Sequence, residues 1–298
     1  MKRFVPLLLV ATMCATAGAQ NSAVLYWNLP TTPSQLAYGA GTLVMAGEPQ
    51  GSAANPASLA DVKWRSLATA GVQWWGGVFG GSVAATLPVG KRSGTAAVTA
   101  GYWGLGAITA YDERGNPLGS VSAQAVCGGV HYGRRLFGGL SAGAGAVFSN
   151  LVLPQRSDLG LAFTAGMHYR WRFLSASLLA RDLGPKYPVN AAGRGKLPSA
   201  LTAGVRSSFW GERIAAGLQL EARDGERPYP VAALEAAPVP LVTARLGYSG
   251  ERDRPEMSPL GAGIAVRTTG RQDFAVEYGY RSYGRLGRVQ ALSLGIRF

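Results

Sequence analysis

The sequence predicts an all-β protein: a transmembrane antiparallel β-barrel of the outer-membrane kind, with about fourteen strands and an N-terminal plug segment. Three observations predict this fold class. Segments in which apolar and polar side chains alternate with a period of two recur through most of the chain. The chain opens with an export signal, and no later apolar run reaches the ~18 residues of a spanning helix. The final strand ends on an aromatic residue, Phe298.

The last ten residues, 289–298, alternate most clearly. Because successive side chains of a strand point to opposite faces, Leu292, Leu294 and Phe298 share one face, and small or charged residues share the other. A soluble domain rarely ends on such a strand, since its terminal residues usually fray. We therefore expect 289–298 to close a barrel. The terminal Phe298 also resembles the signal that barrel assembly machinery recognises.

The first 19 residues have the composition of a secretory signal peptide. Two basic residues and an apolar stretch at 4–10 precede Ala17-Gly18-Ala19, which fits a cleavage site. Cys14 leaves a lipoprotein anchor as an alternative, although the bulky Met13 stands where that processing favours a small residue. Removing 1–19 leaves 279 of the 298 residues and lowers the formal charge from +13 to +11.

This positive charge does not predict a nucleic-acid-binding protein. Lysines and arginines are scattered along the mature chain, with no block of five or six, and an exported chain would not meet nucleic acid. We expect outer-membrane lipid and lipopolysaccharide to supply the counterions. Cys127 is the only cysteine after the signal, so the mature chain has no internal disulfide.

Residues 20–63 lack a strand pattern and are interrupted by prolines. Backbone at membrane depth must be hydrogen-bonded within the protein, so this segment predicts a plug inside the barrel. Near its end, Asn55 can cap a turn and Pro56 fits the first helical position. Asn55-Pro56-Ala57 therefore predicts a helical turn that leads into the first strand.

The remainder, 64–298, predicts the barrel itself. Strands are expected at 66–75, 77–87, 94–104, 120–132, 136–148, 158–170, 172–182, 199–209, 213–222, 229–237, 240–248, 259–268, 272–281 and 289–298. One face of these strands is apolar and the other collects charges that no second apolar layer covers, which favours a polar lumen. The charged residues expected in the lumen are Arg170, Arg206, Glu221, Arg245, Arg267, Glu277 and Arg297.

Aromatic residues gather near the expected strand ends. This distribution is typical of aromatic girdles at the two membrane interfaces, although aromatic residues are also common in strands generally. The residues concerned are Trp74, Trp75, Tyr102, Trp103, Tyr169, Trp171, Trp210, Tyr248, Tyr280 and Tyr283.

Two connections, 110–119 and 182–198, are long and polar. Outer-membrane barrels place their longer loops outside the cell, and loops often carry partner contacts. The candidate contact residues are Asp112, Gly115 and Asn116 in the first connection and Lys186, Tyr187 and Arg194 in the second.

No motif predicts an enzyme, a metal site or a cofactor. Gly139-Leu-Ser141-Ala-Gly143 matches the letters of a nucleophile elbow, but an elbow needs a strand, a sharp turn and a helix, and these letters lie within a strand pattern. His131 and His168 each stand apart from other metal-ligating residues. Cys127 shares its strand parity with Ala125 and is expected to face lipid.

Four stretches resemble the PorV/PorQ family of outer-membrane proteins, which is related to the FadL-like barrels. They are 54–60 (ANPASLA), 110–119 (AYDERGNPLG), 182–186 (DLGPK) with the following Leu197-Pro198, and 280–287 (YRSYGRLG). The resemblance spans nearly all of the mature chain. It implies a fourteen-stranded FadL-like barrel with an N-terminal plug, in the outer membrane of a Gram-negative-type bacterium.

The resemblance implies two alternative roles. Named members of the family act in type IX protein secretion, so the first role is a non-enzymatic shuttle or anchor for secreted cargo proteins or secretion-machinery proteins. The second is a FadL-like channel for hydrophobic small molecules, which an apolar pocket beside the plug would favour. A third hypothesis, an outer-membrane enzyme such as a lipase, would require a Ser/His/Asp or Ser/His/Asn set.

Overall fold

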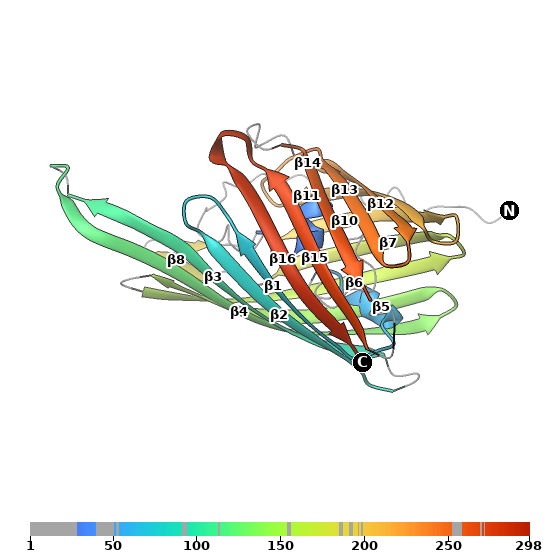
Figure 1. Cartoon of the computed structure of the whole chain (residues 1–298). Helices are drawn as coiled ribbons and strands as arrows, with labels where there is room; N and C mark the ends of the chain where they lie inside the picture. The colour runs from blue at the N-terminus through green and yellow to red at the C-terminus, as the bar shows by residue number, and fades with distance from the viewer. Residues whose placement is uncertain are drawn as a thin grey trace.

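The computed structural model describes residues 29–39, 51, 54–90, 94–112, 114–153, 156–184, 187–190, 193–195, 197, 199–251, 258–268, 270 and 272–298. In this part of the chain, fourteen strands form one closed antiparallel barrel, and two short helices pack against its inner wall (Figure 1). The predicted signal peptide, 1–19, and part of the predicted plug lie outside the described residues. Among the described residues, no helix combines the length and the hydropathy needed to cross a membrane.

The barrel strands follow one another around the wall in chain order. They are β1 (Ser66–Gln73), β2 (Phe79–Pro88), β3 (Thr95–Tyr111), β4 (Pro117–Phe137), β5 (Leu140–Leu153), β6 (Arg156–Trp171), β7 (Leu174–Leu183), β10 (Ala200–Phe209), β11 (Ile214–Arg223), β12 (Tyr229–Val239), β13 (Val242–Ser249), β14 (Leu260–Arg267), β15 (Asp273–Ser282) and β16 (Arg288–Arg297). Between β7 and β10, β8 (Tyr187–Asn190) and β9 (Gly193–Gly195) form a separate two-stranded sheet. Each of the fourteen predicted strands corresponds to one strand of the barrel, so the predicted fold class is confirmed.

The last strand, β16, closes the barrel as predicted. It pairs with β15 on one side and with β1 on the other, where Arg297 lies opposite Ser66. On its outer face Leu292, Leu294 and Phe298 are 52%, 53% and 57% exposed, while Ser293 on its inner face is buried.

The same alternation continues around the barrel. In β6, Leu161, Phe163 and Met167 are exposed on the outside, whereas Thr164 and His168 are buried. The outside is therefore covered by apolar side chains that a soluble protein would bury, which is the arrangement of a barrel surrounded by hydrocarbon.

The connection predicted at 110–119 is shorter in the structure, because β3 continues to Tyr111 and β4 begins at Pro117. β3 and β4 are 17 and 21 residues long and continue to a tight turn, so their hairpin projects beyond the rest of the barrel (Figure 1). β2 pairs with β3 only as far as Gly104, and β5 pairs with β4 only as far as Gln124. Alternating small and apolar residues extend both strands, which leaves only a few residues around Asp112 for the turn.

The start predicted for the fifth strand, at 136, is also wrong. β4 runs on to Phe137, and Gly138 and Gly139 then form the turn before β5 begins at Leu140. Gly138 has a φ of +53°, a left-handed conformation that glycine adopts without steric cost.

The two ends of the barrel differ. Two-residue turns such as Gly138-Gly139 connect strands at one end, where the chain also ends (Figure 1). Longer connections, including 184–199 and 250–259, lie at the other end. We name these the short-turn end and the long-loop end. Outer-membrane barrels direct short turns to the periplasm, so we expect the long-loop end to face outward.

Three aromatic residues predicted for the girdles lie inside the barrel instead. Trp74, Trp103 and Tyr283 are buried, and Trp103 is only 2% exposed. Tyr102 is exposed on the outside beside Trp103, because neighbouring strand residues face opposite sides. The predicted girdle residues that are exposed on the outside also include Tyr169, Trp171, Trp210, Tyr248 and Tyr280.

Cys127 faces the lumen, contrary to the prediction. Val126 and Val130 are exposed on the outer face of β4. Cys127 and the buried Ala125 occupy alternate positions of the same strand, so their side chains face the lumen. Val121 has the same parity but is exposed, because it stands in the projecting part of the hairpin beyond the paired region of β5.

Candidate functional site

The plug contributes two short helices to the lumen. Thr32 caps the N-terminus of α1 (Pro33–Ala37). Its side chain accepts a hydrogen bond from the backbone N–H of Gln35, and the Gln35 side chain accepts one from the backbone N–H of Thr32. η3 (Pro56–Asp61) is a 3-10 helix that begins at Asn55. The Asn55 side chain accepts a hydrogen bond of 3.2 Å from the Ala57 amide, and Pro56 occupies the first position, as the sequence predicts.

Glycines in the wall let both helices approach the barrel closely. α1 lies against β13 to β16, and η3 lies against β3 to β6. A Cβ atom added at Gly261 would lie 2.1 Å from the Leu36 carbonyl oxygen, and one at Gly279 would lie 2.3 Å from the Pro33 carbonyl oxygen. The plug backbone therefore packs directly on the wall backbone, and larger residues at these positions would displace it.

An ionic contact fixes the end of η3 at the short-turn end. Asp61 forms ion pairs of 2.9 Å with Arg135 and 2.8 Å with Arg170. Arg170, predicted as a lumen charge, thus holds the plug, although its side chain is still half exposed. Its partners, Asp61 and Arg135, were not predicted.

A second group of charged residues lies on the inner face of the wall, on β10, β12, β13 and β15. Arg245 forms ion pairs of 2.8 Å with Glu277 and 3.4 Å with Glu235, and Arg206 reaches Glu235 at 3.3 Å. Tyr38, just after α1, donates a hydrogen bond to Glu235, and the Arg245 guanidinium lies 5.6 Å from the centroid of its ring. The predicted lumen charges Arg206, Arg245 and Glu277 therefore meet and bind the plug.

A third group lies toward the long-loop end. Glu221 is fully buried between Arg181, at 2.5 Å, and Arg223, at 2.7 Å. Arg223 also lies 3.6 Å from Glu226 and 3.8 Å from Glu251. Of these residues the sequence predicted only Glu221, because the others lie at or beyond strand ends, where alternation is a weak guide.

The two remaining predicted lumen charges lie at the short-turn end. The Arg297 guanidinium stacks 4.6 Å from the centroid of the Trp64 ring. Arg267 and Arg297 line a small pocket of about 30 Å³ together with Asp273 and Ser293.

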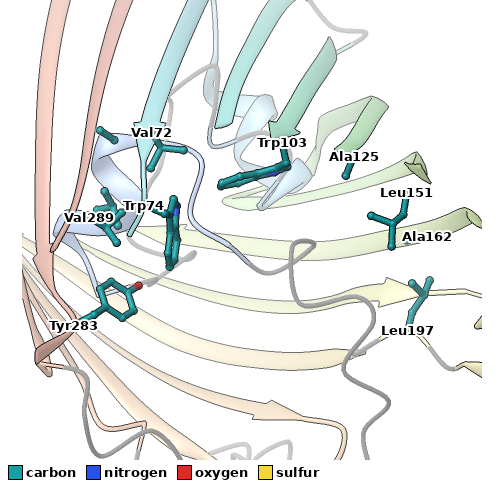
Figure 2. Packing of buried hydrophobic residues seen from close by; sticks show 11 residues of the cluster. Val72, Trp74, Trp103, Ala125, Leu151, Ala162, Leu197, Tyr283 and Val289 are labelled. Atoms are coloured by element: carbon teal, nitrogen blue, oxygen red, sulfur yellow. The ribbon is translucent and has the colours of Figure 1, made fainter. Parts of the chain in front are cut away.

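Apolar side chains also line the lumen toward the long-loop end. Figure 2 shows them converging on the interior from several strands. Trp74 lies 5.2 Å from Tyr283 and 6.3 Å from Trp103 between ring centroids. The buried members of this inner apolar cluster are Leu36, Val72, Trp74, Trp103, Ala125, Leu151, Ala162, Leu197, Tyr283, Val289 and Ala291.

A cavity of about 150 Å³ lies between the plug and the wall, beside this cluster. Trp103 belongs to both, and Leu29 lines the cavity while packing against the cluster. The plug side of the cavity is completed by Thr31, Thr32, Gln35 and Ala54, and the wall side by Ser82, Val83, Ala84, Thr99, Ala100, Gly101, Cys127, Val147, Thr164, Arg181 and Asp182. The sequence did not predict these lining residues. The alternation of side chains along β2, β3 and β4 nevertheless indicates which of them face the lumen.

The predicted contact residues lie in a hairpin tip and a small sheet. Asp112 accepts hydrogen bonds from the backbone of Arg114 and Asn116 and from the Asn116 side chain, which lowers the pKa of its carboxyl. Gly115 adopts a φ of +80° in this turn. Tyr187 pairs with Gly195 in β8 and β9, and Arg194 pairs with Pro188, while Lys186 lies outside the described residues.

The hypothetical nucleophile elbow is not formed. Ser141 is a buried residue near the start of β5, where it pairs with His168 on β6, and the strand continues to Leu153 with no helix after Ser141. His168 instead makes a 2.8 Å hydrogen bond with Ser177. Among the described residues, no group of three or more His, Cys, Asp or Glu could hold a metal ion.

Solved outer-membrane barrels share this architecture. The toluene transporter TbuX of Ralstonia pickettii superimposes with a TM-score of 0.60 at 13% identity, over 91% of this chain and 98% of that one. A FadL homologue of Pseudomonas aeruginosa and the toluene transporter TodX of Pseudomonas putida each give 0.59 at 10% identity, with the same coverage. No protein-family model and no curated protein matches the chain, so the PorV/PorQ resemblance stays a prediction. The chain has the FadL-type outer-membrane barrel fold.

Proposed function

We propose that the protein is a non-enzymatic outer-membrane channel that admits hydrophobic small molecules. The observation that carries this proposal is the inner apolar cluster, which meets the cavity beside the plug at Trp103 and Leu29. An apolar solute that leaves water for such a surface gains about 25 cal/mol for each Å² it buries. The lining thus provides an attractive route from the long-loop end to the plug.

The plug limits how far a solute can move along that route. α1 and η3 pack against opposite parts of the wall, held by glycine contacts and by the Asp61 ion pairs. Passage of a solute past the plug therefore requires these contacts to loosen. The superimposable barrels described as toluene transporters add support to the channel, although the likeness to them is one of fold.

In this proposal the barrel lies in the outer membrane of a Gram-negative-type bacterium. Outer-membrane lipid and lipopolysaccharide would contact its apolar outer face, and barrel assembly machinery would insert it. The lumen charges would keep the plug seated rather than carry out a reaction.

The role in protein secretion or surface attachment draws its support from sequence resemblance alone. A deletion strain separates the two roles. The channel predicts slower uptake of a hydrophobic compound such as toluene, with surface proteins secreted and attached normally. Lost attachment with normal uptake would instead support the secretion role.

Cys127 offers a direct test, because it lines the cavity and is the free cysteine of the described residues. In purified protein, saturating toluene should slow the reaction of Cys127 with a small maleimide. Trp103→Ala should weaken this protection, since the cavity loses its largest apolar wall. Trp210→Ala, on the exposed outer face, is the matched control and should leave protection unchanged. Absence of protection together with normal uptake in the deletion strain would exclude the channel.

A further inference from the structure

We propose that the cavity beside the plug selects neutral molecules of about the size of one aromatic ring that carry a hydrogen-bond-accepting oxygen. Aromatic alcohols are the simplest members of this class. This inference rests on the proposed channel function and specifies its substrate.

The volume of the cavity sets the size of the ligand. The cavity measures about 150 Å³, and a protein cavity of roughly this volume accommodates benzene. A long acyl chain would fill a much larger volume. The cavity therefore fits one ring with a short substituent.

The apolar part of the lining suits an aromatic ring. Trp103 presents its ring, and it is held in place against Gly80, where a Cβ atom would lie 2.6 Å from the indole. Leu29 and Val147 add aliphatic surface, and the Cys127 sulfur is a polarizable neighbour for an aromatic edge. These groups bind a ring without requiring any charge on it.

Two donors in the lining have no hydrogen-bond acceptor. The hydroxyl oxygen of Ser82 and the Nε atom of Arg181 are both inaccessible to solvent and make no hydrogen bond. A buried donor without a partner is costly, and a ligand oxygen that accepts from it removes that cost. The lining therefore favours a ring bearing a hydroxyl or carbonyl oxygen over a plain hydrocarbon.

The charge around Arg181 argues against a carboxylate ligand. Arg181 is already paired with Glu221 at 2.5 Å and lies 4.0 Å from Asp182. The network continues through Arg223 to two further carboxylates, Glu226 and Glu251. Arg181 is thus already matched by carboxylates, so a carboxylate ligand would be repelled by Glu221 and Asp182, whereas a neutral ligand would not.

Three compounds with the same carbon skeleton test the proposal: toluene, benzyl alcohol and benzoate. The measurement is the concentration of each that halves the rate of Cys127 labelling in the full-length barrel at neutral pH. We expect benzoate to need at least about tenfold more than benzyl alcohol. We expect decan-1-ol, neutral but long, to protect less well than benzyl alcohol.

The variant Ser82→Ala isolates the hydrogen bond. It should raise the half-protecting concentration of benzyl alcohol about three- to tenfold and leave that of toluene unchanged, because only the alcohol supplies an acceptor. Ser293→Ala is the matched control, since Ser293 also faces the lumen but lines the separate pocket at the short-turn end. It should change neither value.

The outcomes separate this inference from the channel itself. Equal protection by benzoate and benzyl alcohol, stronger protection by decan-1-ol, or an equal effect of Ser82→Ala on toluene and benzyl alcohol would overturn the selectivity while the channel stands. The comparison of compounds on the unmodified protein decides the matter even where the variant fails to fold. Failure of all four compounds to protect Cys127 would overturn this inference, and normal toluene uptake in the deletion strain would then exclude the proposed channel as well.

Discussion

Gly133 on β4 touches the backbone of the plug at Pro56: a Cβ atom on Gly133 would lie 2.2 Å from the Pro56 carbonyl oxygen. The neighbouring Gly143 on β5 makes the same approach, at 2.4 Å from the Pro56 carbonyl carbon. On another part of the wall, Gly247 and Gly261 make the same close backbone approach to Ala37 and Leu36 of α1. The plug is thus held by backbone packing on glycine, with ion pairs added at its edges.

Gly133→Ala should therefore loosen η3 without opening the barrel. The added methyl group overlaps the Pro56 carbonyl, and overpacking of this kind costs about 1–3 kcal/mol. We expect faster proteolysis of the plug in the folded protein, with an unchanged temperature of barrel unfolding on a heated gel.

Gly128→Ala is the control for this prediction. Gly128 lies on the same strand, but the nearest atom to an added Cβ is 3.8 Å away. It should leave proteolysis at the wild-type rate. Equal rates in Gly133→Ala and the wild type would show that the backbone contact does not hold the plug.

Asp61→Asn should loosen the same helix by a second route. It removes the ion pairs with Arg135 and Arg170, whose side chains are half exposed, so the loss is about 1 kcal/mol after solvent screening. Proteolysis of the wild-type plug should speed up with added salt, and proteolysis of Asp61→Asn should respond less. Glu212→Gln, in an exposed turn, should behave like the wild type. Identical salt responses of Asp61→Asn and the wild type would show that the Asp61 ion pairs do not hold the plug.

Arg245→Met tests the buried charges on the inner face of the wall. It leaves Glu235 and Glu277 without their shared arginine in a buried site, and removing one member of such a pair typically costs 3–5 kcal/mol. We expect a lower unfolding temperature on heated gels, and partial recovery in Arg245→Met/Glu277→Gln because the double variant also removes the buried negative charge of Glu277. Arg213→Met, in an exposed turn, should change stability little. No loss of stability in Arg245→Met would contradict the structural role of the network.

The alternation of side chains predicted the strands and the inward position of most lumen charges, because the period of two is a local property of the chain. It did not predict which charges meet. Arg245 and Glu277 come together through the registers of β13, β14 and β15, and Asp61 meets Arg170 through the docking of the plug, neither of which has a local signal.

The aromatic residues were misplaced for a related reason. Trp103 stands in the middle of β3, because that strand continues to Tyr111 instead of ending near 104, and its side chain points into the lumen, as does that of Trp74 just after β1. Position along the expected strands selected both residues as girdle candidates, whereas the face of the strand decides between lipid and lumen. The cavity beside them also depends on plug residues 29–35, whose path is set by tertiary contacts.

Phe298 directly follows the closing strand β16, and its substitution should act on assembly rather than on transport. Its side chain is exposed on the outer face, and its amide donates a 3.0 Å hydrogen bond to the Arg65 carbonyl at the start of β1. Phe298→Asp places a charge on the lipid-facing side and removes the aromatic group, so the amount of heat-modifiable barrel in outer-membrane fractions should fall several-fold.

Phe298→Tyr keeps the ring and should insert normally. Leu286→Asp, an exposed apolar residue in a connection at the long-loop end, should also insert normally. Wild-type amounts of inserted Phe298→Asp would show that assembly does not depend on this aromatic residue.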